Sequence, residues 1–289
     1  MSRFRDLFDP ASPVILDAGW ATELQKRGLA PGESPDAWNL ARPDDVEAVA
    51  RSFVEAGAQA ILTNTFQGSP LALARVGLDG EARRINEEGA RLSRRATGGA
   101  NVRVLGSIGP TGRRRDLAAE AFTLQAEALA AGGVDALVLE TFGDLAEAGT
   151  ALVAARATGL PVVAAFYFDE ASGEPRTADG SSPEAIAQAM AQAGADAVGA
   201  NCGAGIAGFA EVCRRLASAC DLPIWIKPNA GLPTIVDGKA VYETTADAFA
   251  AALPELVAAG AAFVGGCCGT SPEFIRALRI AARGRGPAR

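Results

Sequence analysis

Two adjacent cysteines near the end of the chain have a spacing that points to metal chemistry. Cys267 and Cys268 lie in the segment GGCCGT, residues 265–270, directly after a short apolar run. A disulfide between them is disfavoured, because neighbouring Cα atoms lie about 3.8 Å apart and bridged cysteines usually need roughly 4.4–6.8 Å. Thiolates are ligands for soft metals, and the chain has no histidine. A metal at this pair therefore needs a further cysteine, a carboxylate or a substrate atom.

A phrase that recurs four times indicates which elements position these residues. Each copy is an alanine-rich helical segment, then a glycine, then a short apolar run; the glycines are Gly57, Gly133, Gly194 and Gly260. Glycine suits the left-handed position that ends a helix, and the run beyond it suits a strand buried on both faces. Further strands are expected at residues 14–16, 102–106, 162–166 and 224–226. Eight alternating units of strand and helix predict a (β/α)₈ barrel of the TIM type.

The alternative architecture is a doubly wound open sheet. Against it, the first strand continues into the segment DAGWAT, residues 17–22, which has no G-x-G-x-x-G phosphate loop. A length of 289 residues with 49% hydrophobic content fits either one barrel or two smaller domains. We expect a single domain over residues 1–289, with its core at about 13–280 and a flexible tail at 283–289.

The barrel hypothesis predicts where the chemistry lies, because active sites of this fold form at the C-terminal ends of the strands. Cys202 ends the sixth strand, so it is expected beside Cys267 and Cys268 on one rim. Three cysteinates suit Zn²⁺ and leave a fourth position open, as in catalytic zinc sites. The alternative is that Cys202 packs in the barrel while the pair lines a glycine turn. Cys213 and Cys220 lie on an expected helix or just beyond its end, and we expect them to be buried or inert thiols.

Zinc on three thiolates is suited to one kind of reaction. Its formal charge of −1 makes it a poor Lewis acid for hydrolysis, yet it can bind and deprotonate a substrate thiol. The sulfur of that substrate is then the nucleophile. A free thiol with a pKa near 8.5 is only about 3% ionised at pH 7, so deprotonation contributes about 30-fold at most. Most of the acceleration must come from holding the thiolate in line with an electrophilic carbon.

Motifs along nearly the whole chain resemble those of the homocysteine S-methyltransferase family. They are ILD and ATEL at residues 15–24, TNTFQ at 63–67, GSIGPTG at 106–112, LET at 139–141, NCG at 201–203, PNAGLP at 228–233 and GGCCGT at 265–270. The resemblance implies a barrel in which Cys202, Cys267 and Cys268 hold zinc and homocysteine is methylated to methionine.

The same resemblance implies a pocket for the amino acid. It places Asp17 and Glu140 at positions that recognise the ammonium group, and Thr65 and Ser107 at positions that complete the pocket. From the residues alone, Asp17 could instead cap the first helix. Asn229 either binds substrate or organises the turn that contains it.

The sequence leaves two alternatives for the identity of the methyl donor. The PNAGLP segment looks most like the homocysteine-binding module of cobalamin-dependent methionine synthase, which also has folate-binding, cobalamin-binding and activation modules. Because this chain ends at residue 289, we expect the methyl group to come from a separate methyl-corrinoid protein or from a small sulfonium compound such as S-methylmethionine. Betaine is disfavoured, because Gln67 and the Thr141-Phe142 pair stand where betaine-using members have tyrosines that cage a quaternary ammonium.

Composition narrows the setting and leaves alternative functions open. A net charge of −7 argues against nucleic acid, and the sequence has no apolar stretch of the roughly 18 residues that a membrane helix needs. We expect a cytoplasmic protein of open oligomeric state, with Arg113–Arg115 as a solvated loop. The alternatives are a zinc barrel with another thiol acceptor, one acting in demethylation, or a non-catalytic zinc- or homocysteine-binding subunit of a multi-protein methyltransferase.

Overall fold

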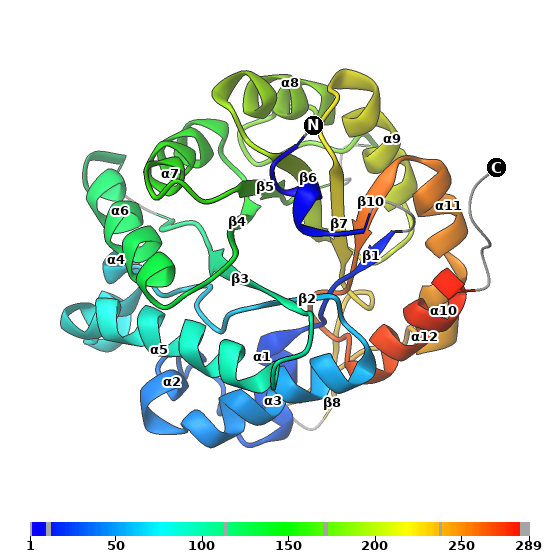
Figure 1. The fold of residues 1–289 in the computed structure, drawn as a ribbon. Coiled ribbons are helices and arrows are strands. Elements are labelled where there is room, and N and C mark those ends of the chain that lie inside the picture. The colour runs from blue at the N-terminus through cyan, green and yellow to red at the C-terminus, as the bar shows by residue number, and fades with distance from the viewer. Residues whose placement is uncertain (1, 10–12, 113–114, 170–172, 237–238, 284–289) are drawn as a thin grey trace.

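The computed structural model describes residues 2–9, 13–112, 115–169, 173–236 and 239–283, and its central feature is a ring of eight parallel strands surrounded by helices (Figure 1). The strand order is β1-β10-β7-β6-β5-β4-β3-β2. The strands are β1 (Val14–Ile15), β2 (Ala60–Leu62), β3 (Arg103–Ile108), β4 (Ala136–Phe142), β5 (Val162–Phe166), β6 (Ala197–Cys202), β7 (Ile224–Pro228) and β10 (Ala261–Val264). The predicted (β/α)₈ barrel is confirmed, and the open sheet is excluded.

Helices follow the strands and cover the outside of the ring. They are α1 (Trp20–Lys26), α2 (Trp38–Ala41), α3 (Pro43–Ala56), α4 (Pro70–Leu73), α5 (Ala82–Ala96), α6 (Arg115–Ala131), α7 (Leu145–Ala157), α8 (Pro183–Ala193), α9 (Phe209–Ala219), α10 (Ala246–Ala251), α11 (Leu253–Ala258) and α12 (Pro272–Arg283). Gly57 and Gly194 end α3 and α8 with φ of 100° and 87°. The glycines therefore do act as helix ends, since these angles are strained for other residues.

Alternation along the strands divides the apolar residues into two layers. Val14 and Leu16 belong to the cluster inside the ring, whereas Ile15 belongs to the larger cluster between the strands and the helices. The segment before β1 lies across the ring (Figure 1), and its fully buried Phe4 packs in the inner cluster against Trp225 and Phe263, with ring centroids 6.1 and 4.8 Å away. Because this end is filled by aromatic rings, the polar site is confined to the opposite end.

The ring is paired by parallel ladders between all neighbouring strands except β1 and β2, among the described residues. At that seam the backbone N–H of Gln59 donates to the carbonyl of Ile15 at 2.7 Å, and the Gln59 side chain accepts from the Ile15 N–H at 3.0 Å. One glutamine thus bridges the lower part of the seam.

A two-stranded hairpin between β7 and α10 was not predicted. It consists of β8 (Thr234–Val236) and β9 (Lys239–Val241), and Ile235 in it is 67% exposed. Arg113, Arg114 and the predicted tail beyond Arg283 lie outside the described residues. No helix in the described part of the chain is long and apolar enough to cross a membrane. The single-domain assignment stays a prediction.

Candidate metal centre and acceptor pocket

Three cysteine sulfurs meet at the C-terminal end of the barrel. Cys202 is the last residue of β6, and Cys267 and Cys268 lie in the loop after β10. The three Sγ atoms lie within 4.8 Å of one another, and those of Cys202 and Cys267 are 3.2 Å apart. The predicted convergence is therefore present. Cys213, fully buried, has its sulfur 3.5 Å from the carbonyl of Ala259 and lies outside the cluster, as does the half-buried Cys220.

The donor set fits zinc. Zn–S bonds of about 2.3 Å in a tetrahedron place sulfurs about 3.8 Å apart, close to the spacing found here. Hydrogen bonds from Cys202 and Cys267 lower the pKa of Cys268, and the pKa of Cys202 is raised by its contacts with the same two cysteines. Metal binding requires the ligand sulfurs as thiolates and would release their protons.

The backbone at Cys202 is strained, and contacts of the neighbouring Asn201 side chain maintain it. Cys202 and Thr141 have φ of 66° and 63°, the only non-glycine residues with positive φ in the described part of the chain. The Asn201 side chain joins them: its Oδ1 accepts from the Thr141 N–H at 2.7 Å, and its Nδ2 donates to the Thr141 hydroxyl at 2.6 Å. Local strain of this kind persists where surrounding contacts enforce it, typically at functional sites.

Backbone hydrogen bonds connect the two cysteine-bearing loops through the end of β7. The Cys267 N–H donates to the Pro228 carbonyl at 2.8 Å, the Ala230 N–H to the Cys268 carbonyl at 2.9 Å, and the Asn229 N–H to the Cys202 carbonyl at 3.1 Å. The Asn229 Nδ2 also donates to the Gly203 carbonyl at 2.7 Å, while its buried Oδ1 has no partner among the described residues. Asn229 therefore organises the turn and keeps one acceptor atom available.

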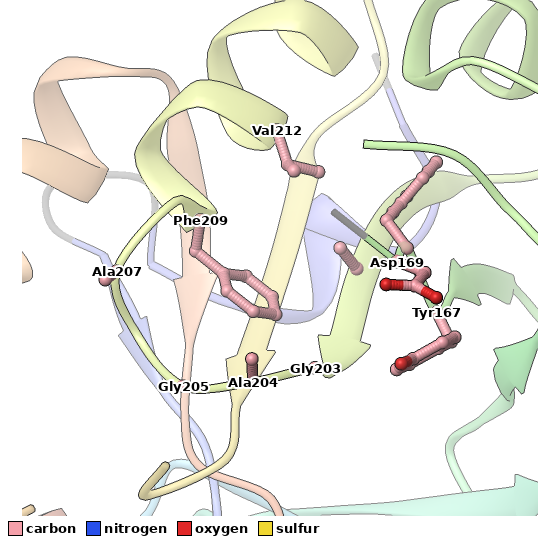
Figure 2. Close-up of a pocket in the computed structure, with 10 residues that line it drawn as sticks. Tyr167, Asp169, Gly203, Ala204, Gly205, Ala207, Phe209 and Val212 are labelled. Carbon is pink, nitrogen blue, oxygen red and sulfur yellow. The ribbon is translucent and has the colours of Figure 1, made fainter. Parts of the chain in front are cut away.

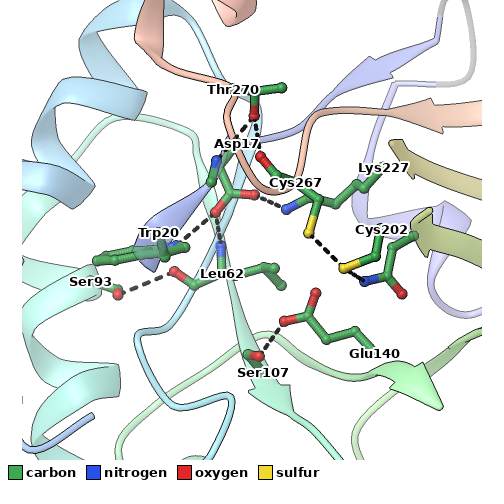
Figure 3. Close-up of polar contacts among 12 residues, drawn as sticks. Asp17, Trp20, Leu62, Ser93, Ser107, Glu140, Cys202, Lys227, Cys267 and Thr270 are labelled. Atoms are coloured by element: carbon green, nitrogen blue, oxygen red, sulfur yellow. Dashed lines mark hydrogen bonds and ion pairs between the residues drawn. The ribbon is translucent and has the colours of Figure 1, made fainter. Parts of the chain in front are cut away.

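Glu140 faces the sulfurs from β4 (Figure 3). The side chain is 6% exposed and accepts a short hydrogen bond from the Ser107 hydroxyl. Burial raises the pKa of Glu140 to about 7, although the ammonium of Lys227 opposes that rise. A carboxylate in this setting gains stability from any further cation that enters the site.

Thr65 does not contact Glu140 through a hydrogen bond but holds the backbone of Ser107, which does. Its hydroxyl donates to the Ser107 carbonyl at 2.8 Å and lies 2.6 Å from the Thr63 hydroxyl. The Thr63 hydroxyl in turn accepts from the Ser107 N–H at 3.0 Å. Of the two predicted pocket residues, Ser107 thus contacts Glu140 directly, and Thr65, fully buried, holds the backbone of Ser107.

Asp17 lies at the end of β1 and is fully buried in an ion pair with Lys227 (Figure 3). Its Oδ1 accepts from the Lys227 ammonium, and its Oδ2 accepts from the Leu62 N–H at 2.7 Å and from Trp20 Nε1 at 3.0 Å. Burial by itself lowers the pKa of Lys227, but the charges of Asp17 and Glu140 outweigh burial and raise it. Lys227 was not among the predicted site residues; the only signal was an ionisable residue in the apolar strand IWIKP.

A small pocket with a volume of about 40 Å³ lies at the turn that follows β6 (Figure 2). Tyr167 and Phe209 line it together with Asp169 and the glycine-rich turn at residues 203–205. Burial raises the pKa of the Tyr167 phenol, and the negative charges of Asp169 and Cys202 add to the rise.

Fold and site together define a barrel with three clustered cysteine sulfurs at its mouth, beside a buried carboxylate. The family model for homocysteine S-methyltransferase matches residues 14–282. The chain belongs to the homocysteine S-methyltransferase family.

Individual relatives agree with this assignment. The chain is 32% identical to a methionine synthase of Mycobacterium tuberculosis and 31% identical to one of Mycobacterium leprae. The alignments cover 96% and 93% of this chain but only about a quarter of each relative, 25% and 24%. Among solved structures, the metallated form of the homocysteine methyltransferase MmuM from Escherichia coli matches with a TM-score of 0.80 and 26% identity, over 96% of this chain and 99% of that one. The oxidised form of MmuM matches with a TM-score of 0.77 and 27% identity, over 93% and 96% of the two chains.

Proposed function

We propose that this protein is a zinc-dependent methyltransferase that moves a methyl group to the thiol of homocysteine and so forms methionine. The observation that carries the proposal is the meeting of three cysteine sulfurs from two loops next to a buried carboxylate. A metal-binding role alone would need the sulfurs and not the carboxylate. A site for an amino acid with a thiol needs both.

Cys202, Cys267 and Cys268 would hold the zinc ion. When bound, zinc supplies the acceptor sulfur as a thiolate at neutral pH, which is worth about 30-fold at most for a thiol of pKa near 8.5. The chain's own residues supply the rest by orientation, where effective molarity contributes about 7–11 kcal/mol. Asn201 and Thr141 serve this purpose by fixing the backbone at Cys202.

Glu140 would bind the ammonium group of homocysteine. Its Oε1 is fixed by the Ser107 hydroxyl, and its second oxygen has no hydrogen bond to the described residues. An incoming ammonium favours the ionised form of this buried carboxyl, so binding and deprotonation of Glu140 support each other. The unpartnered Oδ1 of Asn229 is a further acceptor for the substrate, with Thr65 acting through Ser107. A contact between Asp17 and the ammonium stays a prediction.

A small donor would enter near the turn that follows Cys202. Tyr167 and Phe209 line a small pocket at that turn, and Asp169 adds a carboxylate. Such a surface suits the positive charge of a sulfonium such as S-methylmethionine. A methyl-corrinoid protein acting in trans is the other donor, and the mouth of the barrel would have to be accessible to it.

The experiment is methionine formation by zinc-loaded protein with homocysteine and one donor at a time: S-methylmethionine, a methylated corrinoid and betaine. Turnover with either of the first two supports the proposal and identifies the donor. The matched control is Cys202→Ala, which should give no turnover with any donor. Stoichiometric zinc without methionine from any donor would contradict the proposal and favour a non-catalytic subunit.

A further inference from the structure

Lys227 is the only lysine or arginine buried in the described part of the chain. Its side chain, 2% exposed, extends from β7 and donates to Asp17, whose side chain is 0% exposed. Removing an ammonium from water is costly, so a buried lysine persists only where its charge is compensated. Here it is surrounded by the carboxylates of Asp17 and Glu140 and by the sulfur of Cys267.

The partner of Lys227, Asp17, has both carboxylate oxygens occupied by the protein. Oδ1 is bound to Lys227, and Oδ2 accepts from the Leu62 N–H and from Trp20 Nε1. The bond to Leu62 joins the end of β1 to β2, across the seam that has no strand ladder. Asp17 therefore bridges the upper part of the seam as Gln59 bridges the lower part.

The ion pair also flanks the cysteine loop. β10 lies between β1 and β7 in the sheet, so a bond from Lys227 to Asp17 crosses over the end of β10. On one side the Gly266 N–H donates to the Asp17 carbonyl at 3.0 Å, and on the other the Cys267 N–H donates to the carbonyl of Pro228, next to Lys227. A Cβ at Gly265 would lie 2.8 Å from the Asp17 carbonyl oxygen, so the loop fits here only without a side chain.

We propose that Lys227 is a positioning residue, which fixes Asp17 and the cysteine loop and leaves Glu140 as the one carboxylate that receives the acceptor's ammonium. The inference rests on the proposed function for the identity of the acceptor. It differs from the sequence-based prediction, in which Asp17 and Glu140 share the ammonium. The distinguishing fact is that Asp17 already holds an ammonium, that of Lys227.

The first test compares Asp17→Asn, Lys227→Met and the double variant by zinc stoichiometry and Tm, without any acceptor. Each single variant removes the ion-pair partner of the other buried charge, and the double variant removes both charges. We expect both single variants to have a lower zinc stoichiometry and a lower Tm than the wild type. The double variant should recover most of both losses. Additive losses in the double variant would contradict a role of the pair as a unit. This result does not depend on methyl transfer, so it is separate from the proposed function.

The second test uses protein with native Asp17 and Lys227. It determines which carboxylate binds the ammonium group of homocysteine. Dissociation constants are measured for homocysteine and for 4-mercaptobutanoate, which lacks the amino group, with zinc-loaded wild type and Glu140→Gln. We expect the wild type to prefer homocysteine by about tenfold or more, a typical effect of a charged hydrogen bond, and Glu140→Gln to show no preference while keeping zinc. A preference that survives in Glu140→Gln would show that Glu140 is not the group that receives the ammonium and would overturn the inference. If wild type binds neither thiol in a zinc-dependent way, it is the proposed function that fails, and the first test still decides the role of the ion pair.

Discussion

At the scale of single residues, the site separates thiols that can hold metal from thiols that cannot. Cys202, Cys267 and Cys268 share one cluster, whereas the buried Cys213 lies apart from them, with its sulfur against the carbonyls of Leu256 and Ala259. A metal ion at Cys213 would have no second thiolate within reach. The chemistry of the chain is therefore concentrated in three of its five cysteines.

Replacing Cys202 with alanine should remove bound zinc while the barrel stays folded. The cluster lies at the rim, and the inner and outer apolar layers do not depend on it. Zinc is measured by metal analysis after gel filtration, and the fold by circular dichroism. Cys220→Ala is the matched control and should keep stoichiometric zinc. Global unfolding of Cys202→Ala would instead mark the metal as structural.

The pKa of Glu140 gives a prediction for the pH dependence of homocysteine binding. A carboxyl with a pKa of about 7 is ionised above that pH and neutral below it, so pairing with the ammonium is lost as the pH falls through about 7. Homocysteine also loses its thiol proton when it binds, so this step by itself makes the affinity fall steadily as the pH falls. Titration calorimetry from pH 5.5 to 8.5 should therefore show an affinity that falls more steeply below about pH 7. Glu140→Gln should keep only the steady dependence; identical profiles for both proteins would contradict the role of Glu140.

Residue types and strand ends were enough to place the cysteines and Glu140, because these residues follow apolar runs directly. They put Lys227 and Asn201 at strand ends as well, but they gave no role for either residue. A lysine in an apolar strand gives no indication of its partner until β1 and β7 are placed on either side of β10. Asn201 likewise acts through Thr141, which is sixty positions away in the chain.

At the scale of elements, the close approach of β6 and β7 determines where Cys202 lies. Gly199 in β6 pairs with Trp225 in β7, and a Cβ at position 199 would lie 1.9 Å from the Trp225 carbonyl oxygen. No side chain fits between these two strands without moving the backbone. The end of β6, and Cys202 with it, depends on that contact.

Gly199→Ala should therefore lower the free energy of unfolding by about 3 kcal/mol or more, because the clash is with backbone that cannot rotate away. Gly149→Ala is the control, since nothing lies within 4 Å of the added Cβ in α7. Alanine there should raise stability by about 0.5–1 kcal/mol through helix propensity. Urea denaturation measures both, and equal stabilities for the two variants would contradict the described packing of β6 against β7.

The sequence pattern predicted the main strands because buried parallel strands are short, apolar and preceded by glycine. It did not predict the hairpin of β8 and β9. Ile235 in β8 and Leu232 just before it are apolar yet 67% and 70% exposed, so their pattern does not reflect burial in a core. Periodicity can find an element only where one of its faces is covered.

At the scale of the whole molecule, the barrel is closed at one end by aromatic residues and at the other by polar ones. Phe4, which precedes β1 in the chain, fills the first end and contacts Phe8, Trp225 and Phe263. Among the described residues, the buried charged groups of the ring, Asp17, Glu140 and Lys227, lie at the C-terminal end. The barrel itself was predictable from eight repeating units, but this aromatic closure was not, because Phe4 precedes the first strand.

Phe4→Ala should lower the free energy of unfolding by about 3–5 kcal/mol, since a fully buried ring is lost from the inner cluster. Zinc content at low temperature should stay stoichiometric, because the site lies at the other end. Differential scanning calorimetry and metal analysis check the two parts. A Tm equal to that of the wild type would mean that the segment before β1 does not pack inside the ring in solution.

The central claim is that the three-cysteine cluster receives the sulfur of the acceptor. X-ray absorption at the zinc edge, on zinc-loaded protein with and without homocysteine, tests it most directly, because sulfur at about 2.3 Å is distinguished from nitrogen or oxygen at about 2.0–2.2 Å. We expect the zinc ion to have three sulfur neighbours in the protein alone and four when homocysteine is added. An unchanged sulfur count at saturating homocysteine would contradict it.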